Sequence, residues 1–210
     1  MRPETFLASC FSRLFGVGVI LASIGLSTPA MVGRARADEK THEVKVGDRA
    51  PDFESTDDQG KTWKSKDHVG KKVIVLYFYP ADMTSGCTKQ ACAFRDDMEK
   101  LTDKGVEVIG VSGDSVNNHE VFKKVHKLNF TLLADEKGDI AKKFGVKIIP
   151  GGQFKTKDAE GNDVVLKRGV TAMRWTFVID KDGKVIYKNP KVNPTEDSKQ
   201  ILELLEKSKK

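Results

Sequence analysis

The sequence predicts one α/β domain in which a central mixed β-sheet is covered by helices on both faces. Two observations carry this prediction. Short apolar runs, rich in β-branched and aromatic residues, alternate with stretches whose apolar residues recur at helical spacing. Towards the C-terminus, two such runs joined by a turn are followed by one further helical stretch. A series of βα units that ends in a hairpin and a helix favours a mixed sheet between helical layers.

The N-terminal part of the domain is expected to add a small hairpin to this sheet. Residues 47–52 form a turn rich in glycine, proline and aspartate. Residues 53–63 are interrupted by the sequence Asp-Asp-Gln-Gly, so they predict two short strands joined by a turn. The run over 73–79 predicts a buried strand. Pro80 ends it, because proline has no N–H to donate to a central ladder.

A long helix should follow over residues 85–103, with its apolar residues on one face and Gly105 as its stop signal. Ser115 and Thr195 are candidate N-caps of later helices. The elements expected after the long helix are, in order, a strand over 106–111, a helix over 115–128, a strand over 131–133, a short helix over 140–144, a glycine- and lysine-rich excursion over 150–163, strands over 164–166, 175–179 and 185–187, and a C-terminal helix. A thioredoxin-like sandwich has this order of elements.

Residues 1–37 predict a targeting segment. An apolar stretch over 14–26 is too short for a comfortable membrane span, and residues 35–37 (Ala-Arg-Ala) match an Ala-x-Ala cleavage pattern. We therefore expect a signal peptide and a mature, exported chain that starts near Asp38, is periplasmic or secreted, and has no stable membrane association. Two alternatives remain open: an uncleaved membrane anchor, and an organellar transit peptide, since Glu4 is the only acid in the segment.

Cleavage at this site would leave about 173 residues, enough for one domain with a sizeable core. Within them, residues 38–46 are polar and expected to be flexible, and residues 47–210 are expected to form the domain. Loss of four arginines and one glutamate with residues 1–37 lowers the formal net charge from +6 to +3. The remaining lysines and glutamates are interspersed, which indicates a solvated surface and no nucleic-acid partner.

The cysteines indicate redox chemistry. Cys10 leaves with the targeting segment, so the mature chain keeps Cys87 and Cys92. Two cysteines this close are no disulfide framework, and a bridge between them would restrict the unfolded chain little. Cys87 falls at the start of the expected long helix, where unpaired N–H groups and the helix dipole favour thiolate over thiol. The nearby second cysteine suggests that the first cycles through a disulfide; the alternative is a buried, unreactive thiol.

Pro80, Thr84 and Cys87 spell P-x-x-x-T-x-x-C, and this pattern resembles the active-site signature of the peroxiredoxins. The longer match over residues 77–96, YFYPADMTSGCTKQACAFRD, resembles the peroxiredoxin Q or bacterioferritin comigratory protein subfamily. The resemblance continues through most of the mature chain, at residues 50–53, 110–114, 133–135 and 174–180. It departs from the pattern at Ala81, Met83 and Ser85, and the region from Gly151 to Asp163 is longer and more polar than is usual.

The resemblance implies a thioredoxin-like fold and a role for each site residue. Cys87 would attack the O–O bond of a peroxide and become a sulfenic acid. Thr84 and the backbone N–H of Cys87 would hydrogen-bond the peroxide oxygens. Arg174, at the start of the expected strand over 175–179, would stabilise the thiolate and polarise the peroxide. Without the resemblance, Arg174 would be interpreted as a surface residue at a strand end. Pro80 would shape and shield the pocket.

The resemblance also gives Cys92 a role as the resolving cysteine. In a regular helix, residues five apart have Cα atoms about 8.7 Å apart, whereas a disulfide needs Cα atoms within about 7 Å. If Cys92 resolves Cys87, the first turns of the helix must therefore unwind in each cycle. The alternative is that an outside thiol resolves Cys87 and that Cys92 is inert.

The function expected from these observations is that of a thiol-dependent peroxidase. Hydrogen peroxide and organic hydroperoxides would be its substrates, and a thioredoxin-like protein its reductant. The resemblance implies a monomer, although dimers occur, and no metal, flavin or haem. The four histidines show no metal-ligand spacing. Two rival functions are a thiol–disulfide oxidoreductase, which usually has a Cys-x-x-Cys motif, and a peroxide sensor.

Overall fold

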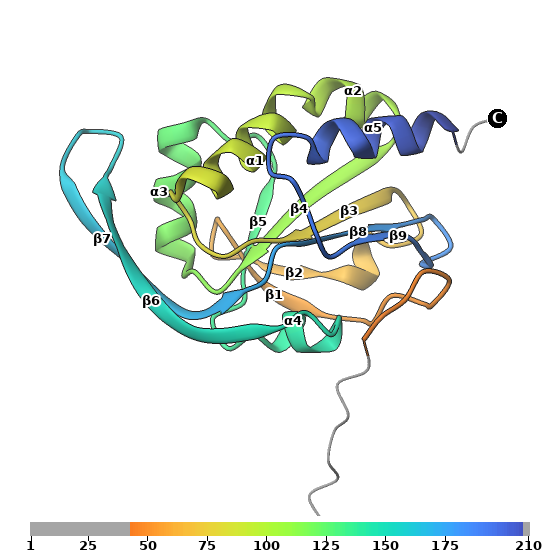
Figure 1. Cartoon of the computed structure of the whole chain (residues 1–210), viewed down its shortest axis with the longest axis horizontal. Coiled ribbons are helices and arrows are strands. Elements are labelled where there is room, and N and C mark those ends of the chain that lie inside the picture. The colour runs from red at the N-terminus through yellow and green to blue at the C-terminus, as the bar shows by residue number, and fades with distance from the viewer. Residues whose placement is uncertain (1–42, 208–210) are drawn as a thin grey trace, which may run out of the picture. The chain divides into compact units, whose positions relative to one another are not determined.

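Seven strands form one mixed sheet in the computed structural model, which describes residues 43–207 (Figure 1). The sheet has the order β2-β1-β5-β4-β3-β8-β9, and β6 and β7 form a separate two-stranded sheet. The strands are β1 (Glu54–Asp57), β2 (Thr62–Lys64), β3 (Val73–Phe78), β4 (Val106–Ser112), β5 (Thr131–Ala134), β6 (Ile148–Lys157), β7 (Asp163–Ala172), β8 (Trp175–Ile179) and β9 (Val185–Asn189). The helices are α1 (Ser85–Asp96), α2 (Met98–Asp103), α3 (Val116–His126), α4 (Asp139–Lys143) and α5 (Asp197–Lys207), with a 3-10 turn, η1 (Ser65–Asp67).

The two faces of the sheet bury different residues of the same strands. In β3, Ile74, Leu76 and Phe78 face one hydrophobic cluster, which α4 helps to cover. Val75 and Tyr77 face a second cluster, to which α1, α2, α3 and α5 contribute. The alternation follows from the two-residue period of a strand. The predicted mixed sheet with helices on both faces is confirmed, as is the N-terminal hairpin, in which β1 pairs antiparallel with β2.

Strand direction places the segment that carries the first cysteine. β3 lies in the middle of the sheet, parallel to β4 and antiparallel to β8. The loop that follows β3 therefore leaves the same edge of the sheet as the loop that follows β4, and β8 begins at that edge. Phe78 at the end of β3 pairs with Trp175 at the start of β8, so residue 174 lies beside the loop that leads into α1.

The predicted long helix over 85–103 is instead two helices. The chain breaks at Asp97, whose φ of −92° and ψ of 4° lie outside the helical region. The carboxylate of Asp97 accepts hydrogen bonds from the hydroxyl of Ser198, at 2.9 Å, and from Lys100, at 2.8 Å. The C-terminal helix also begins later than expected, at Asp197, because the hydroxyl of Thr195 donates to Asn193 in the preceding turn.

The ordered domain begins earlier than the sequence suggested. Residues 38–46 were expected to be flexible, but Val44 is buried in the first cluster and its N–H donates to the carbonyl of Phe144. Glu43 pairs with Lys188 at 2.6 Å. The expected signal peptide lies outside the described residues. Within residues 43–207, none of the helices is long and apolar enough to cross a membrane.

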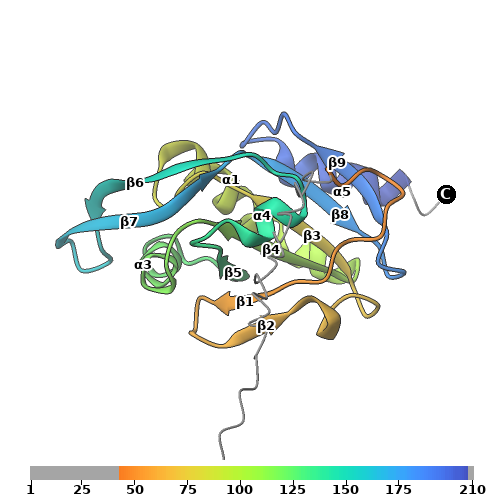
Figure 2. The same ribbon diagram turned by 90° about the horizontal axis from the view of Figure 1, so that it is seen from below.

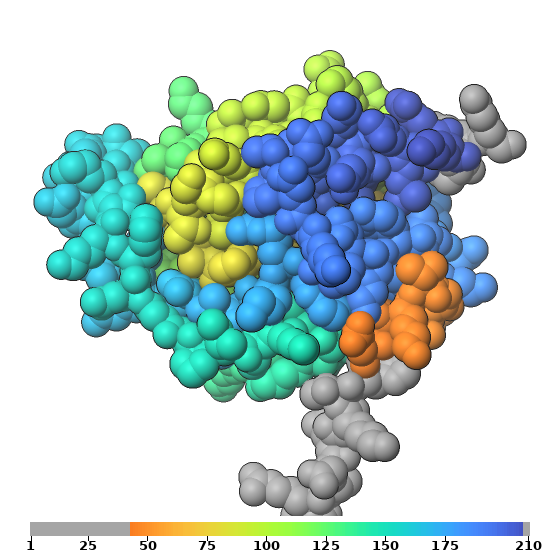
Figure 3. Space-filling model, in the orientation of Figure 1, coloured from red at the N-terminus to blue at the C-terminus, as the bar shows by residue number. Residues whose placement is uncertain are grey.

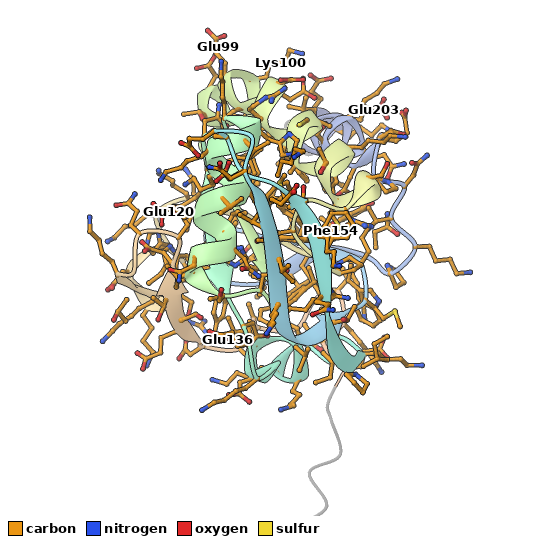
Figure 4. The ribbon with its side chains drawn as sticks, turned by 90° about the vertical axis from the view of Figure 1, so that its left-hand side faces the viewer. Glu99, Lys100, Glu120, Glu136, Phe154 and Glu203 are labelled. Atoms are coloured by element: carbon orange, nitrogen blue, oxygen red, sulfur yellow. The ribbon has the colours of Figure 1, made fainter. Side chains whose placement is uncertain are left out.

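The expected glycine- and lysine-rich excursion is a long hairpin, β6–β7, which runs away from the main sheet (Figure 2). Seen from the side, it lies next to α3, which carries Glu120 (Figure 4). Glycines allow the backbone of the hairpin to lie against the segments that follow β4 and β5. A Cβ atom on Gly113 would lie 2.1 Å from the carbonyl oxygen of Val170, and one on Gly169 would lie 2.1 Å from that of Glu136. Only residues 164–166 of this hairpin were expected to form a strand, whereas β6 and β7 each span ten residues and glycine permits close backbone contact.

A methyl group at Gly113 should therefore destabilise the domain. We expect Gly113→Ala to lower the free energy of unfolding by about 1–3 kcal/mol, because backbone atoms must move to admit it. Gly152→Ala is the matched control, since its Cβ would meet only the flexible end of Arg168, at 3.2 Å. Urea unfolding of both variants measures the difference. Equal stability of the two would contradict the close approach.

Candidate active site

Cys87 is the third residue of α1 and is 2% exposed. Thr84 is the N-cap residue of this helix, in an extended conformation. The backbone N–H groups of the first turn of a helix have no partner within it, and the positive end of the helix dipole lies there. The sulfur of Cys87 thus lies where a negative charge is favoured, as the sequence predicted.

Arg174 contacts the cysteine directly. Its Nη2 donates to Sγ of Cys87 at 3.1 Å, across 87 residues of sequence. The contact depends on the pairing of β3 with β8, which sets residue 174 beside the start of α1. A Cβ atom on Gly86 would lie 3.5 Å from the same Nη2, so the guanidinium also packs closely over the helix start.

Three residues that the sequence analysis missed hold this arginine in place. Nη1 of Arg174 donates to the side-chain carbonyl of Gln90. The amide of Gln90 donates to Asp197 Oδ2 at 2.7 Å, and the hydroxyl of Thr176 donates to the same oxygen at 2.8 Å. Gln90, Thr176 and Asp197 are buried. The spacing of Gln90, three residues after Cys87, places both on one helix face and could have revealed it.

Asp197 links this network to α5. Burial raises the pKa of Asp197, while hydrogen bonds from Thr176 and Gln90 and the charge of Arg174 act in the opposite direction and leave it raised. A buried carboxylate is tolerated only when it is hydrogen-bonded or paired. Asp197 therefore ties the start of α5 to the guanidinium through Gln90, and no residue-type pattern in the sequence connects these segments.

The loop before α1 presents the other predicted site residues. The hydroxyl of Thr84 donates its only proton to the carbonyl of Ala81, at 3.0 Å. Its oxygen can therefore only accept a hydrogen bond from a ligand. Pro80, half-buried, ends the β3 run. Met83 has a φ of +62°, a left-handed conformation that costs a residue other than glycine about 1–2 kcal/mol.

Cys92 lies in the same intact helix as Cys87 and is half-buried. Both thiols are free. Five residues of regular helix separate their Cα atoms by about 8.7 Å, beyond the reach of a disulfide. The structure thus brings Cys87, Thr84 and Arg174 together and keeps Cys92 apart. Among residues 43–207, no group of three or more His, Cys, Asp or Glu side chains is placed to hold a metal ion.

This arrangement suits attack by sulfur on a small polar substrate. The Cys87 thiol at a helix start contacts a fixed guanidinium, and the N-cap residue Thr84 offers a hydrogen-bond acceptor at the same end of the helix. The N–H groups of the first helical turn add donors. The segment that joins β3 to α1 reaches the surface between the β6 region and the C-terminal segment (yellow, between teal and blue in Figure 3).

The sequence profile of the AhpC/TSA family matches residues 46–188, which include all of these groups. The chain belongs to this family. It is 37% identical to the chloroplastic peroxiredoxin Q of Oryza sativa subsp. japonica, over 98% of this chain and 88% of the relative. It is 40% identical to the peroxiredoxin Bcp of Bacillus subtilis, over 77% of this chain and 95% of the relative.

Solved AhpC/TSA structures share the fold. Peroxidoxin BcpB from Mycobacterium tuberculosis superposes with a TM-score of 0.65 at 31% identity, over 79% of this chain and 98% of that chain. The bacterioferritin comigratory protein from Xanthomonas campestris superposes with a TM-score of 0.63 at 24% identity, over 80% and 98%. The resemblance to peroxiredoxin Q and the thioredoxin-like fold are thereby confirmed, and the chain is a thiol-dependent peroxidase.

The forked contact of Arg174 predicts that lysine cannot replace it. We expect Arg174→Lys to slow the oxidation of Cys87 by hydrogen peroxide by about 100-fold or more, since one ammonium cannot bond both Cys87 and Gln90 as the guanidinium does. Stopped-flow measurement of the second-order rate constant tests this. Arg168→Lys is the matched control, because Arg168 bonds Thr171 on the hairpin. A wild-type rate in Arg174→Lys would contradict this role.

Proposed function

We propose that Cys87 is the peroxidatic nucleophile of this enzyme. Its thiolate attacks one oxygen of hydrogen peroxide or an organic hydroperoxide, and the O–O bond breaks. The sulfur gains that oxygen and becomes a sulfenic acid, oxidised by two electrons, while the bonding pair leaves on the other oxygen as hydroxide or alkoxide and takes up a proton. The observation that carries the proposal is the 3.1 Å contact between Arg174 Nη2 and Cys87 Sγ at the start of α1.

The groups around the sulfur have distinct roles in this step. Arg174 stabilises the thiolate before the attack and the negative charge that develops on the leaving oxygen. Thr84 accepts the hydrogen bond of the peroxide O–H, because its own proton is engaged by Ala81. Together with the backbone N–H of Cys87, this orients the O–O bond towards the sulfur. Pro80 shields the pocket from water.

Cys92 resolves the sulfenic acid in the second step. Its thiol attacks Cys87 Sγ, the oxygen leaves as water, and a Cys87–Cys92 disulfide forms. The first turns of α1 must unwind for this step, and the network of Gln90 with Asp197 and Arg174 must open with them. A thioredoxin-like dithiol protein then attacks the disulfide and returns both thiols. Neither step requires a second copy of the chain, since both cysteines belong to one helix.

The two rival functions differ from this one in turnover and spacing. A peroxide sensor would react once per molecule, whereas a peroxidase consumes peroxide as long as reductant lasts. A thiol–disulfide oxidoreductase favours two residues between its cysteines, and four separate Cys87 from Cys92.

Single cysteine substitutions test the cycle. We expect Cys87→Ser to abolish peroxide consumption with every reductant. Cys92→Ser should lose turnover with thioredoxin and thioredoxin reductase but keep part of it with a small thiol, because the sulfenic acid still forms. NADPH oxidation and direct peroxide determination measure both. Full thioredoxin-dependent turnover in Cys92→Ser would contradict its role, and one-shot oxidation in the wild type would favour the sensor.

We further propose that residues 1–37 are a removable targeting segment. Of its two destinations, an organelle gains support from the chloroplastic relatives, because the alignment with the rice protein covers 98% of this chain and so reaches into the segment. Export remains the second candidate. N-terminal sequencing of the protein from its own cells should find a start near Asp38, and fractionation should locate it. A chain that retains residues 14–26 in a membrane fraction would contradict cleavage.

A further inference from the structure

A buried cluster of ionisable groups lies directly under the loop that carries Thr84, and the proposed chemistry does not use it. The cluster contains Asp82 from the loop, Asp114 from the segment between β4 and α3, and His119 from α3. Asp82 and His119 are 0% exposed and Asp114 is 1% exposed. Burial of charged groups costs free energy unless they are paired or hydrogen-bonded. Contacts within the domain must therefore compensate for the burial of these three residues.

Asp82 makes three hydrogen bonds to three different parts of the domain. Its Oδ1 accepts from the hydroxyl of Tyr79 at 2.7 Å, and its Oδ2 faces His119 Nδ1 at 2.8 Å. Its backbone N–H donates to Asp114 Oδ2 at 2.9 Å. Through Asp82, the loop is thereby fixed to the residue that follows β3, to α3 and to the segment that follows β4.

Asp114 is itself held by its neighbours. The hydroxyl of Ser112 donates to Oδ2 at 2.9 Å, and the amide of Asn118 donates to Oδ1 at 2.9 Å. The partner of the Asp82 backbone N–H is thus itself held in place by two hydrogen bonds. No residue of α1 belongs to the cluster, so it can stay intact when the first turns of α1 unwind.

The loop conformation requires such an anchor. Met83, between Asp82 and Thr84, is in the left-handed region at a φ of +62°. Strained backbone persists only where the surroundings hold it in place. Asp82 fixes one side of Met83, and the bond from Thr84 to Ala81 fixes the other. If Asp82 were released, Met83 could relax and the position of Thr84 relative to Cys87 would change.

We propose that Asp82 and His119 are positioning residues for the peroxide pocket: their buried contact holds the loop from Pro80 to Thr84 in the conformation that presents the Thr84 hydroxyl to the substrate. The proposal rests on the proposed peroxidase chemistry at Cys87. It concerns the orientation of the peroxide and leaves the thiolate of Cys87 unchanged, because neither residue contacts the sulfur.

The charge state of His119 adds a pH dependence. Burial lowers the pKa of His119, but the charges of Asp82 and Asp114 and the hydrogen bond to Asp82 outweigh it and leave the pKa raised; the hydroxyl of Tyr79 also faces the ring. The folded-state pKa of His119 lies above the unfolded value of about 6.5. The contribution of protonated His119 to the stability of the domain is therefore complete below about pH 6.5. It is lost as the pH rises through the folded-state pKa.

Two reactions of Cys87 distinguish a role in orienting the peroxide from a general disruption of the site. Peroxide oxidation needs the oriented pocket, whereas alkylation by iodoacetamide needs only an accessible thiolate. We expect His119→Leu to lose about 100-fold in the peroxide rate constant, the scale of a misplaced reacting group, with little change in the alkylation rate. His119→Asn keeps a donor at the position of Nδ1 and should restore most of the peroxide rate. The difference in the free energy of unfolding between His119→Asn and the wild type should become smaller as the pH rises, because the wild type then loses the contribution of protonated His119.

His126→Leu is the matched control, the same substitution on the same helix next to Phe122, and it should change the peroxide rate by no more than about twofold. If His119→Leu fails to fold, Asp82→Asn takes its place, because an amide cannot accept at both positions; it should show the same peroxide-selective loss. Equal losses in both reactions, or a wild-type peroxide rate in Asp82→Asn, would overturn the proposal. Failure of the proposed function is distinct, since the wild type would then show no fast peroxide reaction.

Discussion

The contact between Arg174 and Cys87 is the interaction on which the rest of the site depends. It joins the start of β8 to the start of α1, and it can form only because β3 and β8 are neighbours in the sheet. A guanidinium inside a protein must find acceptors for its donors. Cys87 provides one and Gln90 another. Asp197 then holds Gln90, and Thr176 donates to the same oxygen of Asp197. The central sheet is thus the frame that sets one side chain against one sulfur.

The proposed cycle places two opposing requirements on α1. While α1 is intact, its first turn favours a thiolate at Cys87, but it also keeps Cys92 out of reach. The break between α1 and α2 at Asp97 allows α1 to be intact for the first step and to unwind for the second. Asp97 bonds Ser198 of α5, so α2 stays docked while α1 ends there as a separate unit of only 12 residues. Short helices gain most of their stability from packing, and local unfolding of one unit is cheaper than unfolding of the whole domain. The buried anchor at Asp82 bounds the segment on its other side.

The sequence was most informative where chemistry and local structure coincide. Pro80, Thr84 and Cys87 lie within eight residues, and strand and helix signals alone placed the cysteine at a helix start. Arg174 was found through the family resemblance, since a single arginine at a strand end carries no local signal. The partners Gln90, Thr176 and Asp197 depend on which strands and helices are neighbours in space, and a single sequence does not specify this.

Two features that the sequence did not reveal have identifiable physical causes. Of the hairpin β6–β7, only residues 164–166 were expected to be a strand; the glycine-rich part before them is a strand as well, and its glycines permit close contacts between backbones. The sequence singled out no role for His119, because its contact with Asp82 follows from burial and tertiary packing, which residue spacing does not reveal. In both cases the tertiary environment, and not the local pattern, decided the role of the residue.

Amide hydrogen exchange of the reduced and the peroxide-oxidised protein tests the central claim most directly. If Cys92 resolves Cys87 within one chain, oxidation should remove protection over residues 84–97 and leave α2 protected. Cys92→Ser, oxidised in the same way, should keep the pattern of the reduced protein. Identical exchange over residues 84–97 in the two states of the wild type would contradict the unwinding of α1, and with it the Cys87–Cys92 disulfide.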